Sequence, residues 1–309
     1  MADNLRKLNA LDFSTLMRQT AKLENLDFLR VVTNGEPMSL MGMASSLFAQ
    51  RHAGAVLEKD GKPLAMARVI QWQEEDFAQF QFISALEPDN VNLSAVIEAL
   101  LQDIGEWGLI KVMADLPVSS PFLKAFRKAN FYVWASHQCF TFPFVQSELP
   151  SKNQWETWTA RDFEGIRAVY QTLVPSRIRS YEPMTRSKVL GKVLTNEKGQ
   201  VIAYVDLDYG SKGLWAQPFA LPEANRPAVF EDLLKSLFAE YGRPVTFSAR
   251  SYMPWLRSSL GRLTDQMTEE RALIARYLAL RDRLPEETRE GFFEKSKAEG
   301  TVFTINRNP

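Results

Sequence analysis

Hydrophobic and polar residues follow an order along the chain that occurs twice. In the first half, two apolar runs flank Asp60-Gly61, a pair typical of a tight β-hairpin because glycine takes the positive φ that such turns need. In the second half, Lys198-Gly199 stands between two similar runs. Each hairpin precedes another strand-like segment. We therefore predict a hairpin and a third strand in each half, the third strands lying at 78–86 and 213–221.

The helix after each third strand gives the clearest match between the halves. Apolar residues recur at i, i+3 and i+4 from Ala95 and again from Ala228, 133 positions later. The next helices begin at Pro121 and Pro254, with the same separation. A shared order of seven elements that keeps one offset at two places indicates an internal duplication. Each copy is expected to close on its own strand-like segment, at 132–142 and 266–280.

These patterns divide the chain into two domains and a tail. A length of 309 residues fits two domains, and a hydrophobic fraction of 45% allows each half a core. We predict a first domain at 1–145 and a second at 154–281. The tail, 282–309, contains a charged helix at 285–298 and a short extended end, and belongs to neither copy.

The order strand, helix, hairpin, strand, helix, strand, helix and closing strand resembles the GNAT superfamily of acyl-CoA N-acyltransferases. The segment Phe122–Phe131 is similar to the family segment that ends in Tyr-x-Lys-x-Gly-Phe. Pro88 and Pro222 resemble the proline that precedes the family's pyrophosphate loop. The resemblance implies an α/β fold with a mixed sheet, in which two tandem GNAT-like domains form a pseudo-dimer. We expect a monomer with an internal pseudo-two-fold axis.

The resemblance also implies acetyl-CoA or another acyl-CoA as cofactor, yet the expected loops are altered. Loop glycines normally let backbone amides approach the pyrophosphate at a helix N-terminus. No glycine follows Pro88 before the helix, and Pro227 removes an amide donor from the second loop. Asn225 and Arg226 are the candidate cofactor-binding residues.

The family's tyrosine acid falls on Phe126 in the first copy and near Ser259 in the second. Phenylalanine cannot donate a proton, and serine is a poor acid. The catalytic residues therefore stay unassigned. His137 and Cys139 share a face of a closing strand, and we interpret them as a core cysteine beside a hydrogen-bonded histidine.

Candidate substrate-binding residues lie in the second half. Asp206 and Asp208 alternate along a strand and so point to one face, where they could bind an amine or form a solvated edge. Arg177, Arg179 and Tyr181, followed by Arg186, fall in the region that helps to shape the acceptor pocket in proteins of this fold. An arginine-rich helical surface is the alternative interpretation for that cluster.

Charge and composition narrow the class of protein. A net charge of zero predicts no nucleic-acid partner. One cysteine fits a reducing compartment, and with two histidines it makes a zinc site unexpected. The polar N-terminus does not resemble a signal peptide, and no apolar run reaches the ~20 residues that span a bilayer. We expect a cytoplasmic protein without membrane or metal partners.

Three functions stay open. The first is an N-acyltransferase that moves an acyl group from acyl-CoA to a small-molecule or peptide amine. The second is a catalytically inactive GNAT-fold protein that binds or interacts. The third is a Fem-like transferase using aminoacyl-tRNA, which zero net charge disfavours because phosphate contacts dominate such binding.

Overall fold

The computed structural model describes residues 4–9, 12, 22–37, 39, 49–73, 75–145, 155–184 and 190–278. All of them belong to one compact unit, Met1–Leu278. The predicted tail and Arg186 lie outside the described residues. The domain boundaries at 145, 154 and 281 stay predictions.

The first half supplies seven of the described strands, and the second half supplies the rest. The first-half elements are β1 (Asn4–Lys7), β2 (Lys22–Asn25), α2 (Phe28–Asn34), β3 (Ala49–Lys59), β4 (Lys62–Trp72), β5 (Ala78–Ala85), α4 (Leu93–Glu106), β6 (Lys111–Pro117), α5 (Leu123–Lys128) and β7 (Tyr132–Phe142). The second-half elements are β8 (Trp155–Thr157), η2 (Ala160–Asp162), α6 (Phe163–Leu173), η3 (Ser176–Ile178), β9 (Leu190–Thr195), β10 (Val201–Tyr209), β11 (Leu214–Ala220), η4 (Pro222–Ala224), α7 (Pro227–Tyr241), β12 (Val245–Arg250), α8 (Pro254–Leu260) and β13 (Arg271–Tyr277).

The predicted hairpins and long helices are present. At the tip between β3 and β4, Asp60 has a φ of 52° and Gly61 a φ of 74°, the left-handed pair that a two-residue hairpin turn requires. Gly199 has a φ of 73° between β9 and β10. Helix α7 ends at Gly242, whose φ of 60° gives a left-handed cap.

In the described chain, thirteen strands form one mixed sheet, and its order is nearly a palindrome. The order is β1-β3-β4-β5-β6-β13-β7-β12-β11-β10-β9-β8, with β2 paired beside β5. Counted outward from the central pair β13 and β7, each first-half strand has a second-half counterpart at the same position. For example, β6 corresponds to β12, and β5 corresponds to β11. The two central strands, β13 and β7, pair antiparallel. A pseudo-two-fold axis therefore passes between them, and the fold is two GNAT-like halves arranged as a pseudo-dimer.

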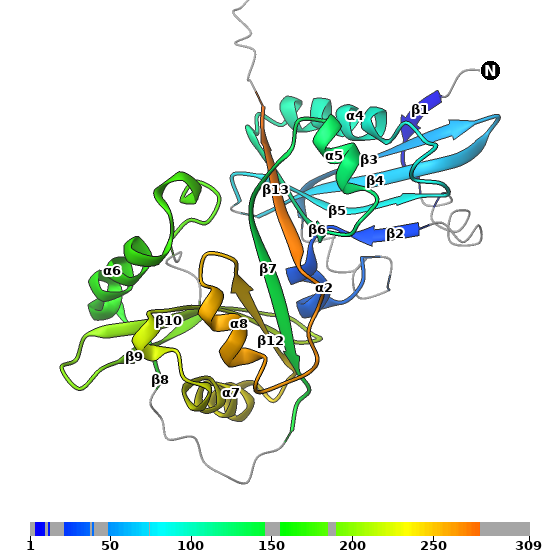
Figure 1. Ribbon diagram of the computed structural model, residues 1–309. Coiled ribbons are helices and arrows are strands. Elements are labelled where there is room, and N and C mark those ends of the chain that lie inside the picture. Colours follow the sequence, from blue (N-terminus) through cyan, green and yellow to red (C-terminus); the bar gives the residue numbers. More distant parts are fainter. Residues whose placement is uncertain are drawn as a thin grey trace, which may run out of the picture. The chain divides into compact units, whose positions relative to one another are not determined.

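The prediction that each half closes its own sheet is wrong. Strand β13 pairs with β6 of the first half, and β7 pairs with β12 of the second, so the halves exchange their closing strands. Figure 1 shows orange β13 running beside green β7 between the two halves. The cores are exchanged accordingly: Phe140 and Phe142 of β7 pack in the second-half core, and Ala272 and Ile274 of β13 pack in the first. An alternating strand pattern does not specify which edge the strand joins.

A gap opens in the first half where two parallel strands diverge. Strands β5 and β6 pair only at Ala78–Val112 and Gln79–Met113. Beyond these pairs, β2 lies against β5, and Leu26 bridges the gap. The Leu26 amide donates to the Gln81 carbonyl at 3.0 Å, and the Leu26 carbonyl accepts from the Asp115 amide at 3.0 Å. The chain itself thus fills this gap.

Candidate functional site

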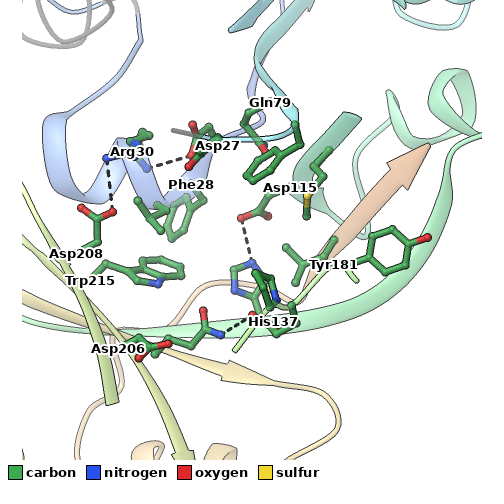
Figure 2. Close-up of a pocket in the computed structure, with 18 of the residues that line it drawn as sticks. Asp27, Phe28, Arg30, Gln79, Asp115, His137, Tyr181, Asp206, Asp208 and Trp215 are labelled. Carbon is green, nitrogen blue, oxygen red and sulfur yellow. Dashed lines mark hydrogen bonds and ion pairs between the residues drawn. The ribbon is translucent and has the colours of Figure 1, made fainter. Parts of the chain in front are cut away.

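A cavity of about 280 Å³, here called the central pocket, is lined by both halves. The first half contributes the start of α2, the end of β4 and parts of β5, β6 and β7. The second half contributes 181–184 and parts of β10, β11, β12 and β13. Figure 2 shows side chains from both halves converging on this space. The pocket therefore exists only when the two halves are together.

Aromatic and acidic side chains dominate the lining of the central pocket. In the described part of the chain, six carboxyl groups line it against two guanidinium groups, those of Arg30 and Arg250. Such a lining favours a cationic ligand, because carboxylates neutralise its charge and aromatic faces attract it. The aromatic residues are Phe28, Trp72, Phe77, Trp134, Tyr181 and Trp215; the acidic residues are Asp27, Glu75, Asp115, Glu182, Asp206 and Asp208.

A chain of buried hydrogen bonds crosses the central strands beneath the pocket. Arg271 Nε donates to Asp115 Oδ1 at 2.8 Å, and His137 Nε2 lies 3.1 Å from Asp115 Oδ2. Ser248 Oγ lies 2.8 Å from His137 Nδ1 and accepts from Arg250 Nη1 at 3.2 Å. Because a carboxylate only accepts, His137 carries its proton on Nε2 and accepts from the Ser248 hydroxyl. The hydrogen bonds thus converge on the Asp115 carboxylate, from Arg271 on one side and from Arg250 through Ser248 and His137 on the other.

Glu182 continues this network into the second half. Its carboxylate accepts from Arg250 Nε at 2.7 Å and from Arg250 Nη2 at 3.0 Å. Tyr252 donates its hydroxyl to Glu182 Oε2 at 3.1 Å, and Gln217 Nε2 donates to Oε1 at 2.5 Å. The planar guanidinium holds the carboxylate at two points, which fixes the segment after η3 against β11 and β12.

Burial sets the protonation states around the pocket. Burial alone would raise the pKa of Asp115, but His137 and Arg271 outweigh it and hold that pKa well below its usual range. Burial lowers the pKa of His137 despite the adjacent Asp115, so the imidazole is neutral at pH 7. Burial raises the pKa of Asp27 to about 6, although Arg30 opposes the shift. Asp27 therefore titrates close to neutrality.

Three of the five predicted substrate-binding residues line the central pocket. Asp206 and Asp208 share a face of β10, as their alternation predicts, and Tyr181 joins them. Their strand is not a sheet edge, since β9 and β8 lie beyond it. Asp208 lies 3.5 Å from Arg30 Nη1 across the two halves. The alternation thus marked part of the pocket, and their role in binding stays a prediction.

The two predicted arginines do not line the central pocket. Arg177 is exposed. Arg179 donates to the carbonyls of Val174 at 3.1 Å and Gln171 at 2.9 Å, so it caps the end of α6. Their role in substrate binding stays a prediction.

The predicted cofactor residues lie at the start of α7, apart from the central pocket. Arg226 is exposed and precedes Pro227, the first residue of the helix. Asn225 is half-buried, and its Oδ1 has no hydrogen-bond partner among the described residues. Their role in cofactor binding stays a prediction.

The core interpretation of His137 and Cys139 is confirmed. Both side chains are buried, and Cys139 Sγ lies 3.6 Å from His137 Nδ1. Burial raises the pKa of Cys139, which keeps its thiol protonated and unreactive. Phe126 packs edge-on against Phe80 and Phe131 in the first core, at centroid distances of 5.1 Å each. Phe126 therefore supplies no proton donor at the position of the family's tyrosine acid.

Sequence reasoning missed most of the pocket. Asp115, Arg250 and Arg271 lie within otherwise apolar strands, and a charge in such a strand is a signal that it is paired when buried. Trp134 and Trp215 give no sequence signal of a site, because an indole in a strand usually packs in the core. The described residues contain no cluster of ligands suited to a metal ion, and none of their helices is long and apolar enough to span a membrane.

Comparison with known proteins shows the fold. No family model and no curated protein matches the chain. A GCN5-related N-acetyltransferase from Sphaerobacter thermophilus is 13% identical, with 89% of this chain and 95% of that chain covered and a TM-score of 0.50. A tandem GNAT protein of the clavulanic acid pathway is 13% identical over 91% and 100%, with a TM-score of 0.43. A GCN5-related N-acetyltransferase from Kribbella flavida is 13% identical over 89% and 71%, with a TM-score of 0.40.

The chain therefore has the GNAT fold of the GCN5-related N-acetyltransferases. The palindromic sheet, with its repeated order of elements, gives it two such units in tandem.

Proposed function

We propose that the protein is a GNAT-type N-acyltransferase whose acceptor is a small cationic amine bound in the central pocket. The carrying observation is the excess of carboxyl over guanidinium groups in a cavity lined with aromatic rings. Asp206 and Asp208 bind the ammonium group, and the rings of Trp215 and Tyr181 contact its apolar part. Asp27 is the proton acceptor in this proposal, because its pKa of about 6 lets it exchange protons near neutral pH.

An acyl-CoA donor, when bound, supplies the acyl group as a thioester. The residues at the start of α4 fit one of its phosphates: a cavity of about 70 Å³ there is lined by Asn92, Lys124 and Lys128. The side chain of Asn92 makes no capping hydrogen bond, but the amides of Leu93 and Ala95 already donate to the Val91 and Asn92 carbonyls. The two lysines are therefore the groups that favour an anion there. Asp89 lines the same cavity and opposes an anion. The start of α7 fits less well, since Pro227 offers no amide.

The part of β5 that lies between that cavity and the central pocket is covered by β2. Gln79 lines the central pocket, and Pro88 lines the cavity at α4. Eight to nine strand residues at ~3.3 Å each separate them by roughly 25–30 Å. A donor laid along β5 would meet β2, which pairs with the last part of that strand. Transfer along this route requires residues 22–26 to move.

This filled gap favours a second candidate, a GNAT-fold protein that binds an amine without transferring an acyl group. In such a binding protein the central pocket takes the amine, and residues 22–26 stay between β5 and β6. Phe126, which packs in the core at the position of the family's acid, favours the same candidate.

Calorimetric titration tests the amine site first. 2-Phenylethylamine is expected to bind saturably and more tightly than 2-phenylethanol, which has the same ring and no charge. The double variant D206N/D208N should weaken the amine about tenfold or more and leave the alcohol unchanged. Asp265, which is exposed outside the pocket, gives the matched control D265N. Equal binding of amine and alcohol would contradict the amine site.

A thiol-release assay then separates the two candidates. Acetyl-CoA with the bound amine should release free thiol and form the acetylated amine if the protein is a transferase. Variant K124M/K128M should raise the donor concentration needed for half-maximal rate. Amine binding with no thiol release and no thermal stabilisation by millimolar acetyl-CoA supports the binding protein.

A further inference from the structure

Two buried indole N–H groups of the central pocket have no acceptor among the residues that the structure describes. Trp134 Nε1 and Trp215 Nε1 are covered by neighbouring atoms and make no hydrogen bond within the described chain. Trp215 is 4% exposed. An indole N–H can only donate, so no rotation or proton exchange lets it satisfy itself. A buried polar group without a partner normally costs stability and calls for a specific explanation.

Other buried indoles of the chain are paired. Trp155 donates to the Val229 carbonyl at 3.0 Å, and Trp255 donates to the Ala220 carbonyl at 3.0 Å. Trp72, which also lines the central pocket, lies 3.4 Å from Asp27 Oδ2. Three other indoles thus have an acceptor within the fold, and the two unpaired donors share one cavity.

The local structure aims both rings at this cavity. The pairing of β7 with β13 shifts register at Trp134. Leu273 pairs with Ala135 and Ile274 with Val133, so Trp134 has no partner on β13. Such a bulge redirects a side chain, here onto the pocket face. Trp134 stacks on Tyr181 with centroids 5.7 Å apart. Figure 2 shows the Trp215 ring between Asp208 and His137.

The acceptor that satisfies these donors is better uncharged than anionic. The lining already has more carboxyl than guanidinium groups, so a further carboxylate is repelled. Arg250 donates hydrogen bonds to Glu182, Gln217 and Ser248. Arg30 is engaged by Asp208 and lies over the Trp72 ring at 4.6 Å. Among the described residues that line the pocket, no guanidinium is therefore left to hold a ligand carboxylate.

We infer that the central pocket takes an amine that also carries an uncharged acceptor oxygen, such as the amide carbonyl of an amino-acid amide, which receives the N–H groups of Trp215 and Trp134. This inference rests on the proposed amine site and narrows its substrate class. The amine faces Asp206 and Asp208, and the oxygen displaces the atoms that cover the indole nitrogens. A cavity of about 280 Å³ suits a ligand of this size.

Three ligands with one ring and one amine test it: phenylalaninamide, 2-phenylethylamine and phenylalanine. Calorimetry on the full-length protein should give the amide about tenfold tighter binding than the plain amine, and phenylalanine the weakest binding. Variants W215F and W134F keep one aromatic ring and lose the indole N–H together with the smaller ring that carries it. Each should remove most of the preference for the amide, measured in the same variant as the ratio of the dissociation constants of phenylalaninamide and 2-phenylethylamine.

Trp107 lies outside the pocket, so W107F is the matched control and should keep the full preference. Equal affinity for phenylalaninamide and 2-phenylethylamine, or an amide preference that survives in W215F/W134F, overturns the inference and leaves the amine site standing. Failure of all three ligands to bind overturns both. Far-UV circular dichroism confirms that each variant is folded before titration.

Discussion

Arg271 and Asp115 lie 156 positions apart in the sequence, and Arg271 Nε donates to Asp115 Oδ1 at 2.8 Å. Arg271 Nη2 also donates to the Asp115 carbonyl at 2.9 Å and to the Asn25 carbonyl at 3.0 Å. One guanidinium from the closing strand of the second half thus joins β6 and the segment that fills the first-half gap. This contact fixes the exchanged position of β13.

Replacing Arg271 with methionine should destabilise the protein strongly. The change leaves Asp115, which is 7% exposed, as a buried carboxylate with His137 as its remaining side-chain partner. Breaking a buried pair on one side typically costs about 3–5 kcal/mol. The free energy of unfolding from urea titration measures the loss. The control is R167M, because Arg167 pairs with Glu164 at the exposed surface and should cost less than about 0.5 kcal/mol. Similar losses in both variants would contradict a structural role for the buried pair.

Local features of the fold could be predicted from the sequence, and long-range pairings could not. Asp60-Gly61 marked its hairpin because few residue pairs accept two positive φ angles. The spacing from Ala95 and Ala228 marked α4 and α7. The partner of β13 was missed because its burial pattern fits either sheet edge, and the choice depends on contacts such as Arg271–Asp115 that join distant segments.

The pocket was predictable to the same limited extent. Alternation placed Asp206 and Asp208 on one face, and this face proves to line the central pocket. The other wall comes from Asp27 and Arg30, over 170 residues earlier, and no local pattern links the two segments. A site assembled between duplicated halves is therefore visible only after the sheet is assembled.

The exchange of closing strands predicts that neither half folds alone. A fragment of residues 1–145 lacks Ala272 and Ile274 from its core and leaves the β6 edge unpaired. It should show no cooperative unfolding transition, whereas mixing it with a fragment of residues 154–309 should restore one. The control is full-length protein cleaved once within 146–153, which keeps every strand and should unfold cooperatively. A stable, cooperatively folded 1–145 fragment would rule out the exchange in solution.

Two glycines should respond to alanine in opposite directions. A Cβ on Gly210 would clash with the Thr33 carbonyl oxygen, so G210A forces the second half away from α2. We expect a loss of about 1–3 kcal/mol. Gly105 lies within α4, where an added Cβ meets nothing within 4 Å. Because alanine favours helix, G105A should gain about 0.5–1 kcal/mol. Thermal unfolding of both variants measures the difference, and a tolerated G210A would show that the two segments do not approach this closely.

The raised pKa of Asp27 makes the free energy of unfolding depend on pH. Burial raises its pKa from 3.8 to about 6, so between these values the folded state keeps a proton that the unfolded state has lost. Stability contributed by this group is therefore full below the lower pKa and falls as pH rises through the folded pKa, by up to roughly 3 kcal/mol for a shift of about two units. Asparagine keeps the cap that Asp27 gives to the Arg30 amide and does not titrate. D27N should thus match the wild type near pH 4 and exceed it at pH 7. Urea titrations at both pH values measure the free energy of unfolding. The exposed control D265N should follow the wild-type curve. A D27N protein less stable than the wild type at pH 7 would mean that the fold stabilises the ionised carboxylate.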